Sequence, residues 1–236
     1  MFFLLHPHQC LHFASVLYVG AHLSVVTLKN YELHDMATGC HLQDFDFSLA
    51  QGETCSISAE DADAAHLFTS ALATLVYPIS GRYIFLDAVL DFEQYQHLLE
   101  YKKQIGYFGP DAALVSNLTV RENLLLSRAY FENRLDLDLD DNVKDLCDAF
   151  DLTEKLDLRP TTLGPLDNRA AIITREITKP LKLFIMDSPE DLIGQPGFDF
   201  LVTRIEQKAA TGIPLVLLCE NNDLIERLTD RTVRIP

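Results

Sequence analysis

The last third of the chain alternates short apolar runs with amphipathic stretches. The runs LFIMD (183–187) and IPLVLLCE (213–220) are apolar up to a final acidic residue, which is typical of strands buried on both faces of a parallel sheet. Helical spacing marks residues 167–178, 198–211 and 222–230, and Gly212 follows the second of these as a natural helix stop. Strands that alternate with helices predict an α/β fold with a mostly parallel sheet.

The first half of the chain is rich in strand-like runs. Gly39 and Gly52 separate three of them, and a stretch with helical spacing and good helix formers follows at residues 62–76. A turn, YPISG, leads to another strand, a short helix and the buried run IGYFG. The predicted strands cover residues 23–33, 41–50, 53–58, 82–90 and 105–109, and the short helix covers residues 94–104.

The middle of the chain, residues 119–156, is predicted to be helical. Thr119 followed by Glu122 forms a capping-box pattern at the start of the first helix, and residues 142–152 form a second helix. The acidic run RLDLDLDD lies between them. We interpret it as a solvated loop, because it lacks the Gly and the terminal Glu of an EF-hand calcium loop.

Charge and apolar content exclude two functional classes. The formal net charge is −16, which argues against a nucleic-acid surface, since such a surface needs Lys and Arg to displace counterions. Beyond the N-terminus no stretch approaches 18 uninterrupted apolar residues, so the body of the chain is not expected to span a membrane. Five cysteines without a CxxC pair indicate reduced thiols in a cytoplasmic protein.

Residues 1–22 are apolar but interrupted by Pro7 and three histidines, and they contain no Lys or Arg. They therefore lack the basic region of a signal peptide. We interpret them as a poorly ordered N-terminal extension, with a weak membrane-touching segment as the alternative.

Six stretches, in this order along the chain, resemble the ATP-binding cassette (ABC) ATPase family. The resemblance implies a P-loop NTPase fold over residues 23–236, with a mostly parallel central sheet, an antiparallel β subdomain and a helical subdomain at about residues 110–165. The local match SNLTVREN is similar to the subfamily that serves lipid-transport systems. The six stretches are DFDFSLAQGE, LVYPISGRYIFLD, IGYFGPDAALVSNLTVRENLLL, RPTTLGPLDNRAAIITREI, KPLKLFIMDSP and LLCENNDLIERLTDR.

The resemblance places the family's Walker A loop, GxxGxGK[ST], over the sequence AEDADAAH. In the family this loop cradles phosphates with backbone N–H groups and a lysine. The glycine positions are Ala59, Ala62 and Ala64, the lysine position is Ala65, and the magnesium-binding hydroxyl position is His66.

Three acids, Glu60, Asp61 and Asp63, stand where a triphosphate would arrive. Like charges about 4 Å apart cost about 4 kcal/mol per pair at an effective dielectric constant near 20. These carboxylates can instead satisfy the positive end of the following helix, as N-terminal acids do. We therefore interpret the loop as a phosphate loop that holds its own internal substitute for phosphate.

The other motif positions of the family also differ in this chain. Walker B keeps an apolar strand and Asp187, which we interpret as structural rather than as a magnesium site. A catalytic histidine needs a nucleophile or a carboxylate partner in a cleft. The nearby acids are possible partners of His66, but no nucleophile is evident nearby, so we expect His66 to be a surface histidine near a helix N-terminus. The altered positions are Pro110 (Q-loop), Gly164, Pro165, Leu166 and Asp167 (signature), Ser188 (catalytic Glu) and Glu220 (H-loop).

The resemblance therefore implies a catalytically degenerate cassette subunit of an ABC-type membrane transporter, with a structural or regulatory role. The partners would be a transmembrane permease subunit and a second ABC ATPase, either a copy of this chain or an active paralogue. We expect no cofactor, or ATP and magnesium if nucleotide binding survives. The expected location is cytoplasmic, on the inner face of the membrane. The alternatives are a weak ATPase that uses Asp187 and Glu220, and a stand-alone regulatory module.

Overall fold

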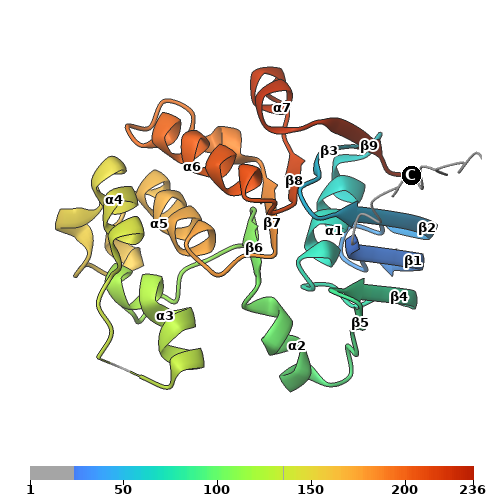
Figure 1. The fold of residues 1–236 in the computed structure, drawn as a ribbon, viewed down its shortest axis with the longest axis horizontal. Helices are drawn as coiled ribbons and strands as arrows, with labels where there is room; N and C mark the ends of the chain where they lie inside the picture. Colours follow the sequence, from blue (N-terminus) through green and yellow to red (C-terminus); the bar gives the residue numbers. More distant parts are fainter. Residues whose placement is uncertain (1–23, 135) are drawn as a thin grey trace, which may run out of the picture.

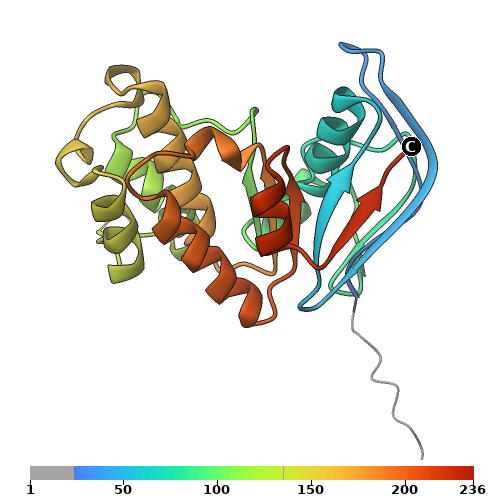
Figure 2. The same ribbon diagram turned by 90° about the horizontal axis from the view of Figure 1, so that it is seen from above.

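The computed structural model describes residues 24–134 and 136–236. Two sheets form its framework, and Figures 1 and 2 show helices α3–α6 at the end of the molecule opposite the antiparallel sheet. The predicted N-terminal extension, residues 1–22, lies outside the described residues.

The first sheet is antiparallel, with strand order β2-β1-β4-β5. Leu42, Phe45, Phe47, Leu49 and Ala50 are the buried residues of β2. The first two are three residues apart rather than two because Asp44 has a φ of 46°, at an irregularity in the pairing with β1. The strands are β1 (Ser24–His34), β2 (His41–Ala50), β4 (Ser80–Phe85) and β5 (Ala88–Val89).

The prediction of one strand over residues 82–90 is wrong. The chain turns back at Leu86 and Asp87, whose φ angles are 50° and 65°, and β5 pairs antiparallel with β4. Two consecutive residues with positive φ make the two-residue hairpin turn that matches strand twist. The sequence lacks the usual Asn-Gly signal for this turn, which is why the pattern did not reveal it.

The second sheet is parallel at each of its four pairings, with strand order β6-β7-β8-β3-β9. Every residue of β7 is buried, as its apolar run predicted, and the buried residues include the terminal Asp187. The predicted fold class, a mostly parallel sheet with an antiparallel β subdomain and helices, is confirmed. The strands are β3 (Thr54–Ser58), β6 (Ile105–Phe108), β7 (Leu183–Asp187), β8 (Leu215–Leu218) and β9 (Arg231–Arg234).

The helices follow the predicted order. The capping box at the start of α3 is present: the Thr119 hydroxyl accepts from the Glu122 amide, and the Glu122 carboxylate accepts from the Thr119 amide. Helix α1 ends earlier than predicted, and Thr74 just beyond it has a φ of 60°. The helices are α1 (Ala62–Leu72), α2 (Tyr95–Lys102), α3 (Val120–Glu132), α4 (Asp141–Ala149), α5 (Pro165–Ile177), α6 (Phe198–Ala210) and α7 (Asn222–Leu228).

Two apolar cores hold these layers together. One lies between α1 and the antiparallel sheet, where Phe68 contacts Phe45 and Phe47. The other joins the helices α3–α7 to strands β6, β7 and β8. In the part of the chain that the structure describes, no helix is both long enough and apolar enough to cross a bilayer.

Candidate functional site

The segment between β3 and α1 is short because the helix starts early. Helix α1 begins at Ala62, and the Asp61 carboxylate caps it by accepting a hydrogen bond from the Asp63 amide at 3.0 Å. Among residues 58–66 none has a positive φ. The alanines at the family's glycine positions are therefore unstrained, because a capped helix needs no left-handed residue.

Two of the three acids of this segment are already engaged in the fold. Asp61 satisfies the helix N-terminus, and Glu60 forms an ion pair with Arg234 on β9. The hypothesis of an internal substitute for phosphate thus finds a physical counterpart in Asp61, whereas Glu60 is held by a different element.

Ala64 and Ala65 lie in the core rather than at the surface. Their exposed fractions are 4% and 3%, and both belong to the apolar cluster between α1 and the antiparallel sheet. At the lysine position of the family, this chain therefore places a buried methyl group. Phosphate recognition depends on positive charge and free amide donors. Ala65 supplies no charge, and the Asp61 cap occupies the Asp63 amide.

A carboxylate–histidine–carboxylate bridge occupies the space between α1 and the ends of β6 and β7. His66 Nδ1 lies 2.8 Å from Asp187 Oδ2, and His66 Nε2 lies 2.9 Å from Asp111 Oδ2. Asp111 follows Pro110 in the segment after β6, and its side chain is 61% exposed. His66 lies near the N-terminus of α1 with a side chain that is 34% exposed, and the structure adds two carboxylate partners that the sequence did not assign to it.

Asp187 is the buried end of this bridge. Besides His66, its carboxylate accepts hydrogen bonds from the hydroxyls of Thr69 and Ser188, each at 2.9 Å. Three donors on one carboxylate satisfy a buried charge in the way that burial requires. Within residues 24–134 and 136–236, no group of three or more His, Cys, Asp or Glu side chains is placed to hold a metal ion.

Two opposing effects set the pKa of His66. Burial of the ring lowers the pKa, whereas the hydrogen bond and charge of Asp187, and then those of Asp111, raise it. The carboxylates outweigh burial, and the pKa of His66 lies above its ordinary value. Protonation of His66 and folding therefore favour each other.

We expect the stabilising contribution of His66 to fade as the pH rises. A raised folded-state pKa gives stability that is fully present below the unfolded-state value and is lost as the pH passes through the folded-state value. Replacing His66 with glutamine should lower the free energy of unfolding by about 1 kcal/mol near pH 6, an amount limited by solvent screening of a partly exposed ring. The loss should be smaller near pH 9. Urea unfolding at both pH values measures it.

The matched control for this experiment is His97→Gln, which changes an exposed histidine on α2. This variant should follow the pH dependence of the unchanged protein. A pH-independent cost of His66→Gln would contradict the ion-pair interpretation and leave only a neutral hydrogen bond.

Arg169, which no sequence motif indicated, connects the segments that follow β6 and β7. Its guanidinium lies 3.9 Å from the centroid of the Phe108 ring and donates to the Gly109 carbonyl at 2.8 Å. It also donates to the Ser188 carbonyl at 3.3 Å and to Asp191 at 3.2 Å. The only signal in the sequence was the charge of Arg169 itself, within the amphipathic stretch that became α5.

The remaining predicted site residues lie at the ends of elements. Gly164 is the N-cap of α5 and Pro165 its first residue, and Leu166 is partly exposed. Asp167 accepts from Lys155 at 2.8 Å. The Glu220 amide donates to Glu190 at 2.8 Å. Hydrogen bonds thus join three of the predicted positions, His66, Asp187 and Ser188. Asp111, which also contacts His66, directly follows the predicted position Pro110.

Comparison with known proteins gives a consistent relationship at low identity. No family model matches the sequence. The chain is 23% identical over 195 residues to the macrolide export ATP-binding/permease protein MacB of Campylobacter jejuni, covering 82% of this chain and 30% of MacB. It is 25% identical over 175 residues to the cytochrome c biogenesis ATP-binding export protein CcmA of Haemophilus ducreyi, covering 74% of this chain and 77% of CcmA.

Solved structures show the same fold. The bacterial ABC transporter cassette MJ0796, in its dimeric structure, superimposes with a TM-score of 0.76 at 15% identity, covering 89% of this chain and 94% of that one. The chain spans about a third of the length of the MacB relatives that it matches.

Proposed function

We propose that this chain, which resembles ABC transporter ATP-binding domains in sequence and in fold, is a catalytically degenerate subunit of an ABC-type membrane transporter. Its role would be structural or regulatory. The subunit would work at the inner face of the membrane without nucleotide hydrolysis of its own.

The observation that carries this proposal is the state of the loop between β3 and α1. The side chain at the lysine position is the buried methyl of Ala65, and Asp61 caps the helix end where phosphate oxygens would be bound. Phosphoryl transfer depends on positioning and charge neutralisation. A loop that offers acids in place of a cation disfavours both.

The bridge of His66, Asp111 and Asp187 supports the proposal from a second direction. His66 stands at the family's magnesium-ligand position, and the Asp187 carboxylate already accepts three hydrogen bonds. An imidazolium between two carboxylates supplies positive charge at this point from within the chain itself. A magnesium ion would have to displace that interaction.

We expect millimolar ATP with magnesium to leave the melting temperature of the purified protein unchanged. An intact site at 100 times its dissociation constant would add about 2.7 kcal/mol. For a chain of this size that gain would raise the melting temperature by about 5–10 °C. Thermal unfolding with and without nucleotide measures the shift, and calorimetric titration with ATP measures binding directly.

Micromolar ATP binding would contradict the proposal. If Asp187→Asn then abolished hydrolysis, the alternative of an ATPase with an unconventional site, using Asp187 and Glu220, would be supported instead. Glu220 is exposed, and as a carboxylate it is a potential general base for such chemistry.

A groove between α2, α3 and α5 supports a permease partner. Its cavity is about 480 Å³, and Tyr95 and Tyr130 on its walls are 54% and 64% exposed. Lys102 lies over the Tyr95 ring and Lys103 over the Phe131 ring. On a chain with a net charge of −16, this basic and aromatic surface fits an amphipathic helix with acidic residues, as a permease segment could supply.

The partners in the proposed assembly follow from the relatives. MacB combines ATP-binding and permease functions in its name, and MJ0796 forms a dimer. We therefore infer a transmembrane permease and a second cassette domain, either another copy or an active paralogue, as partners. The lipid-transport subfamily, suggested by SNLTVREN, is a narrower form of this proposal. A purified chain that stays monomeric and captures no permease would favour a stand-alone regulatory module.

A further inference from the structure

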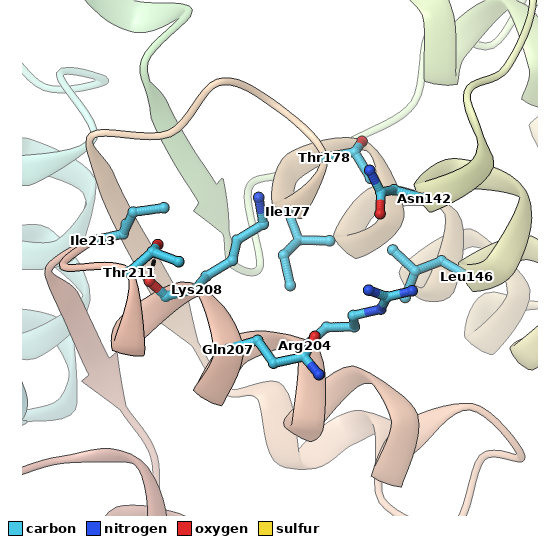
Figure 3. Close-up of a pocket in the computed structure, with 9 residues that line it drawn as sticks. All are labelled: Asn142, Leu146, Ile177, Thr178, Arg204, Gln207, Lys208, Thr211 and Ile213. Atoms are coloured by element: carbon cyan, nitrogen blue, oxygen red, sulfur yellow. Dashed lines mark hydrogen bonds between the residues drawn. The ribbon is translucent and has the colours of Figure 1, made fainter.

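A second pocket lies far from the candidate site. It is a cavity of about 240 Å³ between α4, α5 and α6 (Figure 3). Ile213 on its wall leads into the start of β8, whereas Asp187 stands at the end of the parallel neighbour β7. The pocket and the candidate site therefore lie toward opposite ends of these parallel strands. The lining residues are Asn142, Leu146, Ile177, Thr178, Arg204, Gln207, Lys208, Thr211 and Ile213.

Two cations from one helix line this pocket. Arg204 and Lys208 are four residues apart on α6, so their side chains share a face, and Figure 3 shows both extending into the space bordered by α4 and α5. Like charges at this spacing destabilise a helix unless a negative charge compensates them. The lining itself includes no acidic side chain.

The two cations differ in how they are compensated. Arg204 donates to the Asp145 carboxylate at 2.7 Å. Lys208 has no carboxylate within 4.0 Å among residues 24–134 and 136–236. Burial lowers the pKa of Lys208, the charge of Arg204 lowers it further, and Asp140 partly offsets this. The Lys208 ammonium is thus a partly desolvated cation beside a cavity. Its attraction for an anion is stronger there than in open solvent.

The rest of the lining defines the body of the ligand. Leu146, Ile177 and Ile213 give the pocket an apolar wall, and the side-chain amides of Asn142 and Gln207 add hydrogen-bond donors. The cavity is smaller than the range of about 300–1,000 Å³ that drug-sized ligands occupy. A ligand therefore needs an anionic head and a compact apolar body.

We propose that this pocket binds a small organic anion, either a phosphomonoester or a carboxylate carried on a compact apolar group. The anionic head lies between Lys208 and Arg204, and the apolar body lies against Leu146, Ile177 and Ile213. This site is independent of the loop between β3 and α1, and binding there requires no nucleotide.

The test uses the full chain with phenyl phosphate and benzoate as probes and benzyl alcohol as the uncharged comparison. Calorimetry gives affinities, and methyl NMR of the isoleucines and leucines locates the site. We expect shifts at Leu146, Ile177 and Ile213 with both anions and none with benzyl alcohol. The probe that binds with the higher affinity shows whether the pocket prefers a phosphate or a carboxylate. Raising the salt from about 50 to about 500 mM should weaken binding, because screening acts on a partly exposed pair of cations.

Substitution separates the pocket from general electrostatics. Lys208→Met keeps the apolar stem and should weaken binding of the better anion by about tenfold, in line with the loss of one charge-assisted hydrogen bond. Arg204→Gln provides a second variant if the first fails to fold. Lys144→Met, at an exposed position of α4 that faces away from the pocket lining, makes the same charge change and should leave the affinity unaltered.

Three results would overturn the proposal. The first is that Lys208→Met, Lys144→Met and the unchanged chain bind the anion with equal affinity. The second is that benzyl alcohol binds as well as the anions. The third is that the NMR shifts are confined to methyl groups outside this pocket. The proposed transporter role is tested by ATP binding at the loop between β3 and α1, which is a different site, so none of these results bears on that role.

Discussion

Replacing Glu176 with alanine should lower the free energy of unfolding by about 3–5 kcal/mol, the range found when one partner of a buried ion pair is removed. The Glu176 side chain is only 4% exposed. Its carboxylate pairs with Arg175 at 2.8 Å and with Lys179, and it accepts from the Tyr107 amide at 3.1 Å. The alanine variant leaves two nearly buried cations and one amide without their acceptor. Guanidinium unfolding measures the loss.

The control is Glu132→Ala, which removes the partner of Arg128 in an ion pair one helical turn apart on the exposed surface of α3. That change should cost no more than about 1 kcal/mol. Equal costs for the two variants would show that burial does not amplify the Glu176 cluster. Glu176→Gln, which keeps the shape and the hydrogen-bonding capacity, should fall between the two.

Replacing Phe68 with alanine should cost about 3–5 kcal/mol, as for other fully buried aromatic side chains. Phe68 on α1 has an exposed fraction of 0% and its ring lies 5.1 Å from that of Phe47 and 5.7 Å from that of Phe45. The cavity would open where α1 packs on the antiparallel sheet. Thermal and denaturant unfolding both report the loss.

Tyr130→Ala serves as the control for this change, because Tyr130 is an aromatic residue at the surface of α3 that is 64% exposed. Its substitution should change stability by no more than about 0.5 kcal/mol. A Phe68→Ala cost near that value would mean that the helix and the sheet close the cavity by moving together, and that the two layers are more loosely packed than the ring contacts indicate.

The sequence predicted the elements best where one local signal decided the outcome. The apolar run 183–186 became, together with Asp187, the fully buried strand β7, and Thr119 with Glu122 formed the expected capping box. The hairpin between β4 and β5 was missed because Leu86 and Asp87 carry no recognisable turn signal. Their positive φ values follow from the pairing of the two strands on either side of them, which is not a local property.

In the candidate site, too, the sequence identified some features and missed others. The resemblance to the ABC ATPase family identified Ala65, His66 and Asp187 as the positions of interest, because they align with its Walker A and Walker B motifs. It did not connect His66 with Asp187 and Asp111, which are 121 and 45 residues away along the chain. Arg169 was missed for the same reason, since its partners follow strands β6 and β7.

By itself the sequence determined the order of strands and helices, the buried parallel strands and the acidic character of the loop after β3. Those features depend on apolar periodicity and on residue type, which are local. Only the tertiary structure decided that Asp61 caps α1, that His66 bridges two carboxylates and that Arg204 and Lys208 line a pocket. These outcomes depend on which side chains the packed layers bring within hydrogen-bonding distance, and on how far burial strengthens the charges that meet there.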